Sequence, residues 1–210
     1  MKIISQIRLG SKLKHFSQDQ IKSEPSFFRA TREYAYEHGG EITKHFLDNL
    51  EYKGDTLIDS RVHMLMPTFY PCIPGYHHDD VPREAKNKQP EYYNPSYRSK
   101  EAMALFNGDI CPTEFALGEA EFTEPDVDGL VYKKWHYEVV DKIKNGELKT
   151  MNAPSNQIIY FDDRSWHQGV KANARGFRMF IRATWDTKVP TRNEIRNQVQ
   201  VYLEDPMNGW

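Results

Sequence analysis

The chain has 210 residues, enough for one domain with a hydrophobic core, and we expect a single domain. Its 28 lysines and arginines nearly balance 30 aspartates and glutamates, so the overall charge gives no reason to expect a nucleic acid or an anionic membrane as a partner. Cys72 and Cys111 are too few for a disulfide framework, and with no leader-like segment and no run of about 18 apolar residues we expect a cytoplasmic chain.

Residues 1–55 are predicted to be helical and to buttress a sheet formed by the rest of the chain. A helix is expected to begin near Pro25, which suits a first helical turn, and to end at Gly39-Gly40. Between these positions, residues at helical spacing could face a core: Phe27, Phe28, Thr31, Tyr34 and Ala35. A second, shorter helix is expected over residues 42–50.

The pattern changes to β-rich alternation over residues 56–70. One face of this strand would carry Val62, Met64 and Met66, and the other His63 and Leu65. Two prolines and a glycine then make residues 71–76 a turn. Residues 81–101 hold three prolines and three tyrosines among many charges and show no apolar period, so they are predicted to form a long loop.

Short strands and one helix are predicted beyond the loop. The strands are expected at residues 102–106, 113–117, 120–122, 148–151, 157–161 and 177–185, with turns at Asn107-Gly108 and Gly118. The helix, residues 131–146, places Val131, Trp135, Val139 and Ile143 along one stripe, which indicates core packing. The polar tail, residues 188–210, is either a trailing strand or an arm onto another subunit.

A run of two histidines and two aspartates, residues 77–80, offers metal ligands. On a strand, alternate side chains share a face, so His77 with Asp79, or His78 with Asp80, could bind one metal. The two pairs would lie on opposite faces, and only one of them can face the interior. A single His-x-Asp triplet also occurs in ordinary surface loops, so the hypothesis needs another ligand.

His167 is the candidate third ligand, and Arg178 follows eleven residues later in a strongly β sequence. A guanidinium inside a β core is costly unless it meets an anion, and its planar fork matches a carboxylate. Arg178 therefore indicates a buried acidic ligand. Two imidazoles and one carboxylate leave three coordination positions of an iron open, which is the arrangement of non-haem Fe(II) oxygenases.

These residues resemble the iron(II)/2-oxoglutarate-dependent oxygenase superfamily, whose pattern is His-x-Asp, a later His, and an Arg or Lys about ten residues beyond it. The stretch PSNQIIYFDDRSWHQGVKANARGFRMFIRATW, residues 154–185, is similar to the corresponding segment of prolyl-hydroxylase-type members. The resemblance covers about residues 56–187. The sequence departs from the pattern at Asn156-Gln157, where the family often has Gly, and at Phe180, where a small polar residue is common.

The resemblance implies a mainly β fold, a double-stranded β-helix (jelly-roll) barrel over residues 56–187, with the N-terminal helices packed on it. It also implies that His77, Asp79 and His167 bind Fe(II), while Arg178 binds the distal carboxylate of 2-oxoglutarate. An aromatic residue before the first ligand, here Tyr76, favours this register. The implied reaction uses O2 to hydroxylate a C–H bond and converts 2-oxoglutarate to succinate and CO2.

Three further residues are candidates for the site. Tyr70 or Thr68 could give a hydroxyl to the co-substrate, although either could be an ordinary strand residue. Arg182 lies four residues after Arg178, hence on the same strand face, where it could bind the substrate or a second carboxylate. A salt bridge at the rim of the barrel is the alternative role for Arg182.

Two other functions remain open: a cupin-like barrel that binds metal without 2-oxoglutarate, and a non-catalytic interaction module that uses loop 81–101. Aromatic residues among basic groups can stack bases and follow phosphates. The basic residues of the loop exceed the acidic ones only slightly: Arg83, Lys86, Lys88, Arg98 and Lys100 against Glu84, Glu91 and Glu101. We therefore expect a solvated lid, and a small molecule or a peptide as the substrate before a nucleic acid.

Overall fold

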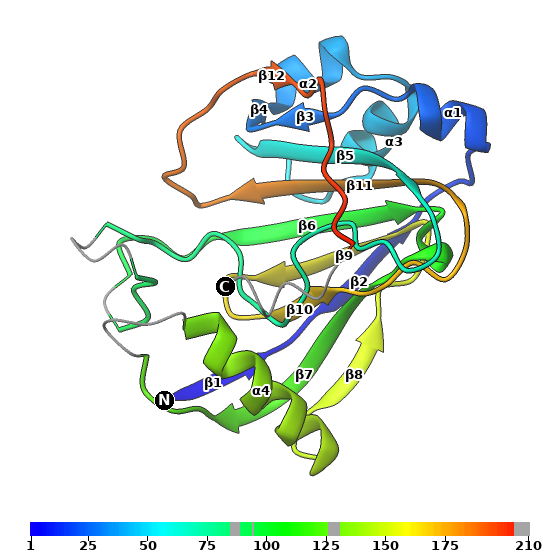
Figure 1. The fold of residues 1–210 in the computed structure, drawn as a ribbon. Coiled ribbons are helices and arrows are strands. Elements are labelled where there is room, and N and C mark those ends of the chain that lie inside the picture. The colour runs from blue at the N-terminus through cyan, green and yellow to red at the C-terminus, as the bar shows by residue number, and fades with distance from the viewer. Residues whose placement is uncertain (85–88, 94, 126–130, 204–210) are drawn as a thin grey trace.

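A computed structural model describes residues 1–84, 89–93, 95–125 and 131–203 (Figure 1). The fold is mainly β, and its two larger sheets are not closed into a barrel. Across the six-stranded sheet the strands are β2 (Arg8–Lys12), β9 (Gln157–Asp162), β6 (Lys100–Phe106), β11 (Gly176–Trp185), β5 (Leu57–Leu65) and β4 (Ala30–Thr31). The four-stranded sheet contains β1 (Lys2–Ser5), β7 (Thr113–Glu121), β10 (Trp166–Gly169) and β8 (Lys149–Asn152).

Helices cover the outer face of each sheet, and the inner faces meet. Alternate residues of β6 point to opposite sides: Ala102, Ala104 and Phe106 join a core with α1 (Gln18–Ser23), α2 (Arg32–His38) and α3 (Glu41–Asn49). The intervening Met103 and Leu105 pack against Phe115 of the other sheet. On the far side of that sheet lies α4 (Val131–Lys144) (Figure 1). Strand alternation thus divides the interior into three apolar layers.

The prediction of an all-helical segment 1–55 is wrong for its first twelve residues. These residues form β1 and β2, which pair with β7 and β9. The single helix expected after Pro25 is also wrong in its first half, because Phe27–Phe28 forms the short strand β3 and Ala30–Thr31 forms β4. Helix α2 begins only where the Thr31 side chain accepts a hydrogen bond from the Tyr34 amide, and it ends at Gly39 as expected. The second predicted helix is confirmed by α3.

The β core agrees more closely with expectation, with two corrections. β5 stops at Leu65, and the chain turns over residues 66–69 instead of continuing as a strand to residue 70. Gly118 is not a turn: β7 runs through it as one strand, with the glycine at a φ of +135° that side-chain-bearing residues rarely adopt. Helix α4 buries Val131, Trp135 and Val139 as predicted, whereas Ile143, the last residue of the predicted stripe, is only partly buried.

The tail after residue 187 returns along the sheet. Its short strand β12 (Glu194–Ile195) pairs with β3, and further on Tyr202 forms an isolated bridge with Tyr70. Figure 1 shows this segment crossing β5 and β11 on the side opposite the helices α1–α3. Of the two alternatives left by the sequence, the described part of the tail therefore packs on its own chain. None of the helices in the described part of the chain is both long and apolar enough to cross a membrane.

Candidate functional site

Backbone pairing brings the two candidate histidine ligands together. The amide of His77 donates to the carbonyl of His167 at 3.0 Å, and the amide of His167 donates back at 3.3 Å. The two imidazole rings lie edge to face, with their centroids 4.6 Å apart and their planes at 61°. His167 lies on β10, a four-residue strand that the sequence did not indicate. In β10 Trp166 points outward toward α4, so alternation turns His167 inward.

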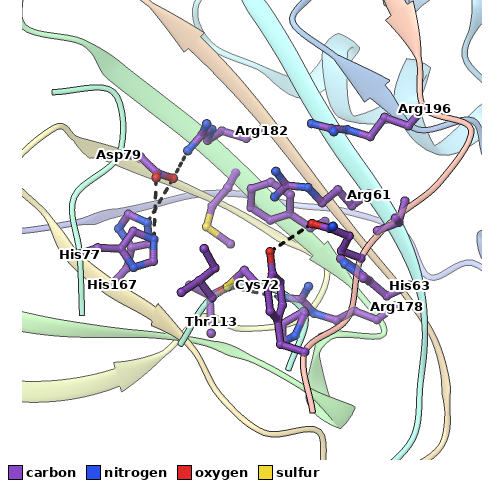
Figure 2. A pocket seen from close by; sticks show the side chains of 18 of the residues that line it. Arg61, His63, Cys72, His77, Asp79, Thr113, His167, Arg178, Arg182 and Arg196 are labelled. Carbon is purple, nitrogen blue, oxygen red and sulfur yellow. Dashed lines mark hydrogen bonds and ion pairs between the residues drawn. The ribbon is translucent and has the colours of Figure 1, made fainter. Parts of the chain in front are cut away.

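Asp79 completes a cluster whose potential ligand atoms all lie within 4.8 Å of one another. Its carboxylate oxygens lie 3.8 Å from Nε2 of His77 and 3.3 Å from Nε2 of His167 (Figure 2). A metal bonded at about 2.1 Å to such atoms would hold neighbouring ligand atoms about 3 Å apart. Both distances to Asp79 exceed this separation by less than about 1 Å, so the three side chains lie close enough to converge on one metal.

Hydrogen bonds also fix the tautomers that a metal requires. Nδ1 of His77 lies 2.8 Å from the Gly75 carbonyl oxygen, and Nδ1 of His167 lies 3.0 Å from that of Ser165. A carbonyl can only accept, so each Nδ1 donates its proton there, and Nε2 is the nitrogen of each ring that is left to bind a metal; Nε2 of His167 lies within hydrogen-bond distance of the Asp79 carboxylate. This is the arrangement by which backbone groups orient metal-binding histidines.

The electrostatics of the cluster also suit a cation. Burial, followed by the neighbouring His167, lowers the pKa of His77 to about 4, so its ring is neutral near pH 7. Burial alone would raise the pKa of Asp79, but Arg182 and the two imidazoles outweigh it and hold that pKa well below its usual range. Burial lowers the pKa of His167, whereas the Asp79 carboxylate raises it, and the net shift is upward.

The alternative pair of residues points elsewhere. His78 stacks on Trp166 with 3.6 Å between ring centroids, and its Nδ1 lies 2.9 Å from the Tyr92 hydroxyl in the core beneath α4. Asp80, at a φ of 51°, accepts a hydrogen bond of 3.1 Å from the Tyr97 hydroxyl. The structure thus groups His77, Asp79 and His167 and excludes His78 from the same cluster.

Arg182 links Asp79 to a second carboxylate. Its Nη1 pairs with Asp79 and lies 3.3 Å from Glu101, a fully buried residue of β6. Burial, partly opposed by Arg182, raises the pKa of Glu101 to about 7. Arg182 therefore forms salt bridges with two carboxylates of the protein, which corresponds to the salt-bridge alternative considered for it, and one of these bridges positions a candidate metal ligand.

The cluster opens into a cavity of about 570 Å³ between the two sheets. Arg178 lines this cavity and is only 2% exposed. Its Nη2 lies 3.3 Å from the Thr113 hydroxyl, while its Nε has no hydrogen-bond partner among the described residues. No carboxylate in the described part of the chain lies within ion-pair distance of it. Burial lowers the pKa of Arg178, a sign that its charge is poorly compensated.

The remaining candidates are less closely involved. Tyr70 and Thr68 are not among the residues that line the cavity: Tyr70 is bridged through its backbone to Tyr202, and Thr68 lies in the turn after β5. Within loop 81–101, Tyr92 packs beneath α4. Lys86 and Lys88 of the same loop lie outside the described residues.

The sequence reasoning missed three cavity or site residues: Thr113 at the start of β7, Glu101 on β6, and Arg61 on β5. For Arg61 a signal existed, since Asp59, Arg61 and His63 alternate along one strand and must share a face. That face is the one turned to the cavity, which Arg61 and His63 line.

No protein-family model matches this chain, and no curated protein matches it either. Two crystal structures of an N-substituted L-amino acid dioxygenase from Burkholderia ambifaria AMMD are similar to it, each at 13% identity. They cover 68% and 69% of this chain with TM-scores of 0.40 and 0.39, and the second contains alpha-KG. The chain spans 57% and 58% of their length. Likeness of this degree does not identify an activity for this chain.

Proposed function

We propose that the protein is an Fe(II)- and 2-oxoglutarate-dependent dioxygenase that hydroxylates a C–H bond of a small substrate and releases succinate and CO2. The observation that carries the proposal is Arg178, a buried guanidinium without a carboxylate partner in the described chain, in the same cavity as a His-x-Asp…His cluster. Two facing β-sheets with the cluster between them also suit the double-stranded β-helix, which we propose as the fold family.

The metal would be held by Nε2 of His77, Nε2 of His167 and a carboxylate oxygen of Asp79. This donor set is one that iron accepts in the facial 2-His-1-carboxylate arrangement. When bound, the iron would supply the activation of O2 that side chains cannot provide. Arg182 would keep the Asp79 carboxylate oriented, and the carbonyls of Gly75 and Ser165 would keep the two rings in place.

The co-substrate would be held at its distal carboxylate by Arg178, with the Thr113 hydroxyl beside it. A charge-assisted hydrogen bond between a guanidinium and a carboxylate is stronger than a neutral one, and burial strengthens it further. The aromatic and apolar lining of the same cavity, which includes the buried Met103 and Phe161 and the partly buried Phe180, would exclude water from the reacting groups.

A test of the co-substrate is anaerobic titration of the Fe(II)-loaded protein with 2-oxoglutarate, followed by visible absorption. A weak charge-transfer band is expected, and succinate should form when O2 is admitted. Arg178→Ala should weaken 2-oxoglutarate binding at least about tenfold and leave metal affinity unchanged. Arg175→Ala removes the same charge from an exposed position three residues away and should behave like the wild type.

Binding of metal without any effect of 2-oxoglutarate would refute the proposal in favour of a metal-binding barrel of the cupin kind. Such a site would leave the buried charge of Arg178 without an anion. A wild-type protein that binds neither metal nor co-substrate would support the non-catalytic module.

A separate test concerns the ligands. Asp79→Ala should reduce the affinity for Fe(II), or for Zn(II) as a redox-inert probe, far more than Asp80→Ala, since only Asp79 lies beside both imidazoles. Equal losses in the two variants, measured by competition with a chromogenic chelator, would contradict the ligand assignment.

A further inference from the structure

Four arginines line the cavity, and they differ in how their charges are compensated: Arg61, Arg178, Arg182 and Arg196. Arg182 pairs with Asp79 and Glu101, and Arg196 pairs with Asp59 at 2.9 Å. Neither of the other two has an acidic side chain within 4.0 Å in the part of the chain that is described. Two uncompensated guanidinium groups therefore face one cavity.

Strand pairing places Arg61 between the arginines of the neighbouring strand. In the register of β5 and β11, Arg61 lies opposite Phe180, with Arg178 two residues to one side and Arg182 two residues to the other. All three project from the same face of the sheet into the cavity, as Figure 2 shows. Arg61 thus lies along the wall that connects the Arg178 end of the cavity with the metal cluster.

This concentration of positive charge is unfavourable without an anion. The charge of Arg61 adds to the effect of burial in lowering the pKa of both Arg178 and Arg196. Like charges in a partly desolvated space repel one another, and the described carboxylates near these arginines are already paired, Asp59 with Arg196, and Asp79 and Glu101 with Arg182.

The proposed co-substrate accounts for one of the two free guanidinium groups. 2-Oxoglutarate has two carboxylates, one for the metal and one for Arg178, and none remains for Arg61. The cavity volume, about 570 Å³, falls in the range of small-molecule sites, roughly 300–1,000 Å³, so a compact ligand fits better than a folded macromolecule. The amide side chains of Gln198 and Gln200, from the tail, line the same cavity and could add hydrogen bonds.

We infer that the molecule oxidised at this site is a small organic acid whose carboxylate is bound by Arg61. The inference rests on the proposed function and adds a substrate class to it. Arg61 is then a specificity-determining residue: it distinguishes an acid from the corresponding neutral amide and holds the carbon chain of the acid between β11 and the tail, beside the metal cluster.

The experiment uses the full chain loaded anaerobically with Zn(II) and saturated with 2-oxoglutarate, so that the co-substrate site is already filled. Straight-chain carboxylates from butanoate to octanoate are then titrated and the melting temperature is followed, with the matching primary amides and inorganic phosphate as controls. Carboxylates are expected to raise the melting temperature of the wild-type complex, whereas the amides are expected to leave it unchanged. Arg61→Gln should weaken the apparent affinity for the carboxylates at least about tenfold. Arg175→Gln makes the same change of charge at an exposed position and should leave the stabilisation by carboxylates unchanged.

The outcomes separate the two proposals. If 2-oxoglutarate itself fails to bind the wild type, the proposed function fails. If 2-oxoglutarate binds but no carboxylate adds stability, or if Arg61→Gln responds like the wild type, the inference is overturned and the function stands. If Arg61→Gln loses 2-oxoglutarate instead, Arg61 serves the co-substrate and the inference is likewise wrong. Stabilisation by phosphate and not by carboxylates would also overturn it, since the occupant would then be a phosphate.

Discussion

Replacement of Arg178 by methionine should make the ligand-free protein more stable. The side chain is 2% exposed, its hydrogen bond to Thr113 is long at 3.3 Å, and no carboxylate in the described chain neutralises it. A buried charge without a counterion costs several kcal/mol, part of which the water in a cavity recovers. Methionine has a similar length and no charge, so we expect a gain of about 1–2 kcal/mol, or about 2–8 °C in melting temperature for a domain of this size.

The order of stability should reverse with the co-substrate present. At a 2-oxoglutarate concentration about 100-fold above its Kd, the Zn(II)-loaded wild type should gain about 2.7 kcal/mol, and Arg178→Met should gain little. Thermal denaturation with and without 2-oxoglutarate measures both effects, with Arg175→Met as the exposed control. A variant that melts below the wild type without ligand, yet keeps the full ligand-induced gain, would show that Arg178 stabilises the fold and does not bind the anion.

Three further predictions concern other parts of the molecule. Arg182→Ala should lower metal affinity about 10–100-fold, because the guanidinium orients Asp79; chelator competition measures this. Trp135→Ala should cost about 3–5 kcal/mol in denaturant unfolding, whereas Tyr137→Ala, on the exposed side of the same helix, should change stability by less than about 0.5 kcal/mol. Burial, aided by nearby arginines, lowers the pKa of His63 to about 3 from 6.5, so below pH 6.5 the unfolded chain binds a proton there that the folded protein does not. The free energy of unfolding should therefore fall as the pH drops from about 6.5 to 3. In His63→Leu it should fall less steeply, and the two slopes should differ by up to about 1.4 kcal/mol per pH unit. Equal slopes in the wild type and the variant would contradict the lowered pKa of His63.

The elements that were predicted well from the sequence are those with a recognisable pattern of apolar residues within the element itself. Helix α4 repeats Val131, Trp135 and Val139 on one stripe, and β11 is a long β-rich run. The three candidate ligands were also recognisable, because His-x-Asp has the spacing of a strand face and Arg178 lies in an apolar context that a charge would otherwise avoid.

The elements that were missed depend on partners distant in sequence. Every residue of β2 is at least partly exposed, so no buried face marks it, and only its pairing with β9 makes it a strand. β10 is mostly buried, but at four residues it is too short to show an alternating pattern, so it too is a strand because of its pairing with β7. Gly118 was predicted to form a turn because glycine is common in turns. In the structure it lies within β7 at a positive φ that residues with a side chain rarely adopt.

The backbone hydrogen bonds between His77 and His167 have a consequence for how the centre is assembled. Because these bonds join the main chain and not the rings, the two imidazoles are held next to each other by an isolated backbone bridge between residue 77 and β10, with or without an ion between them. Little ordering entropy is then lost when an ion arrives, so the protein can fold first and acquire its metal afterwards, and it can exchange one metal for another without unfolding.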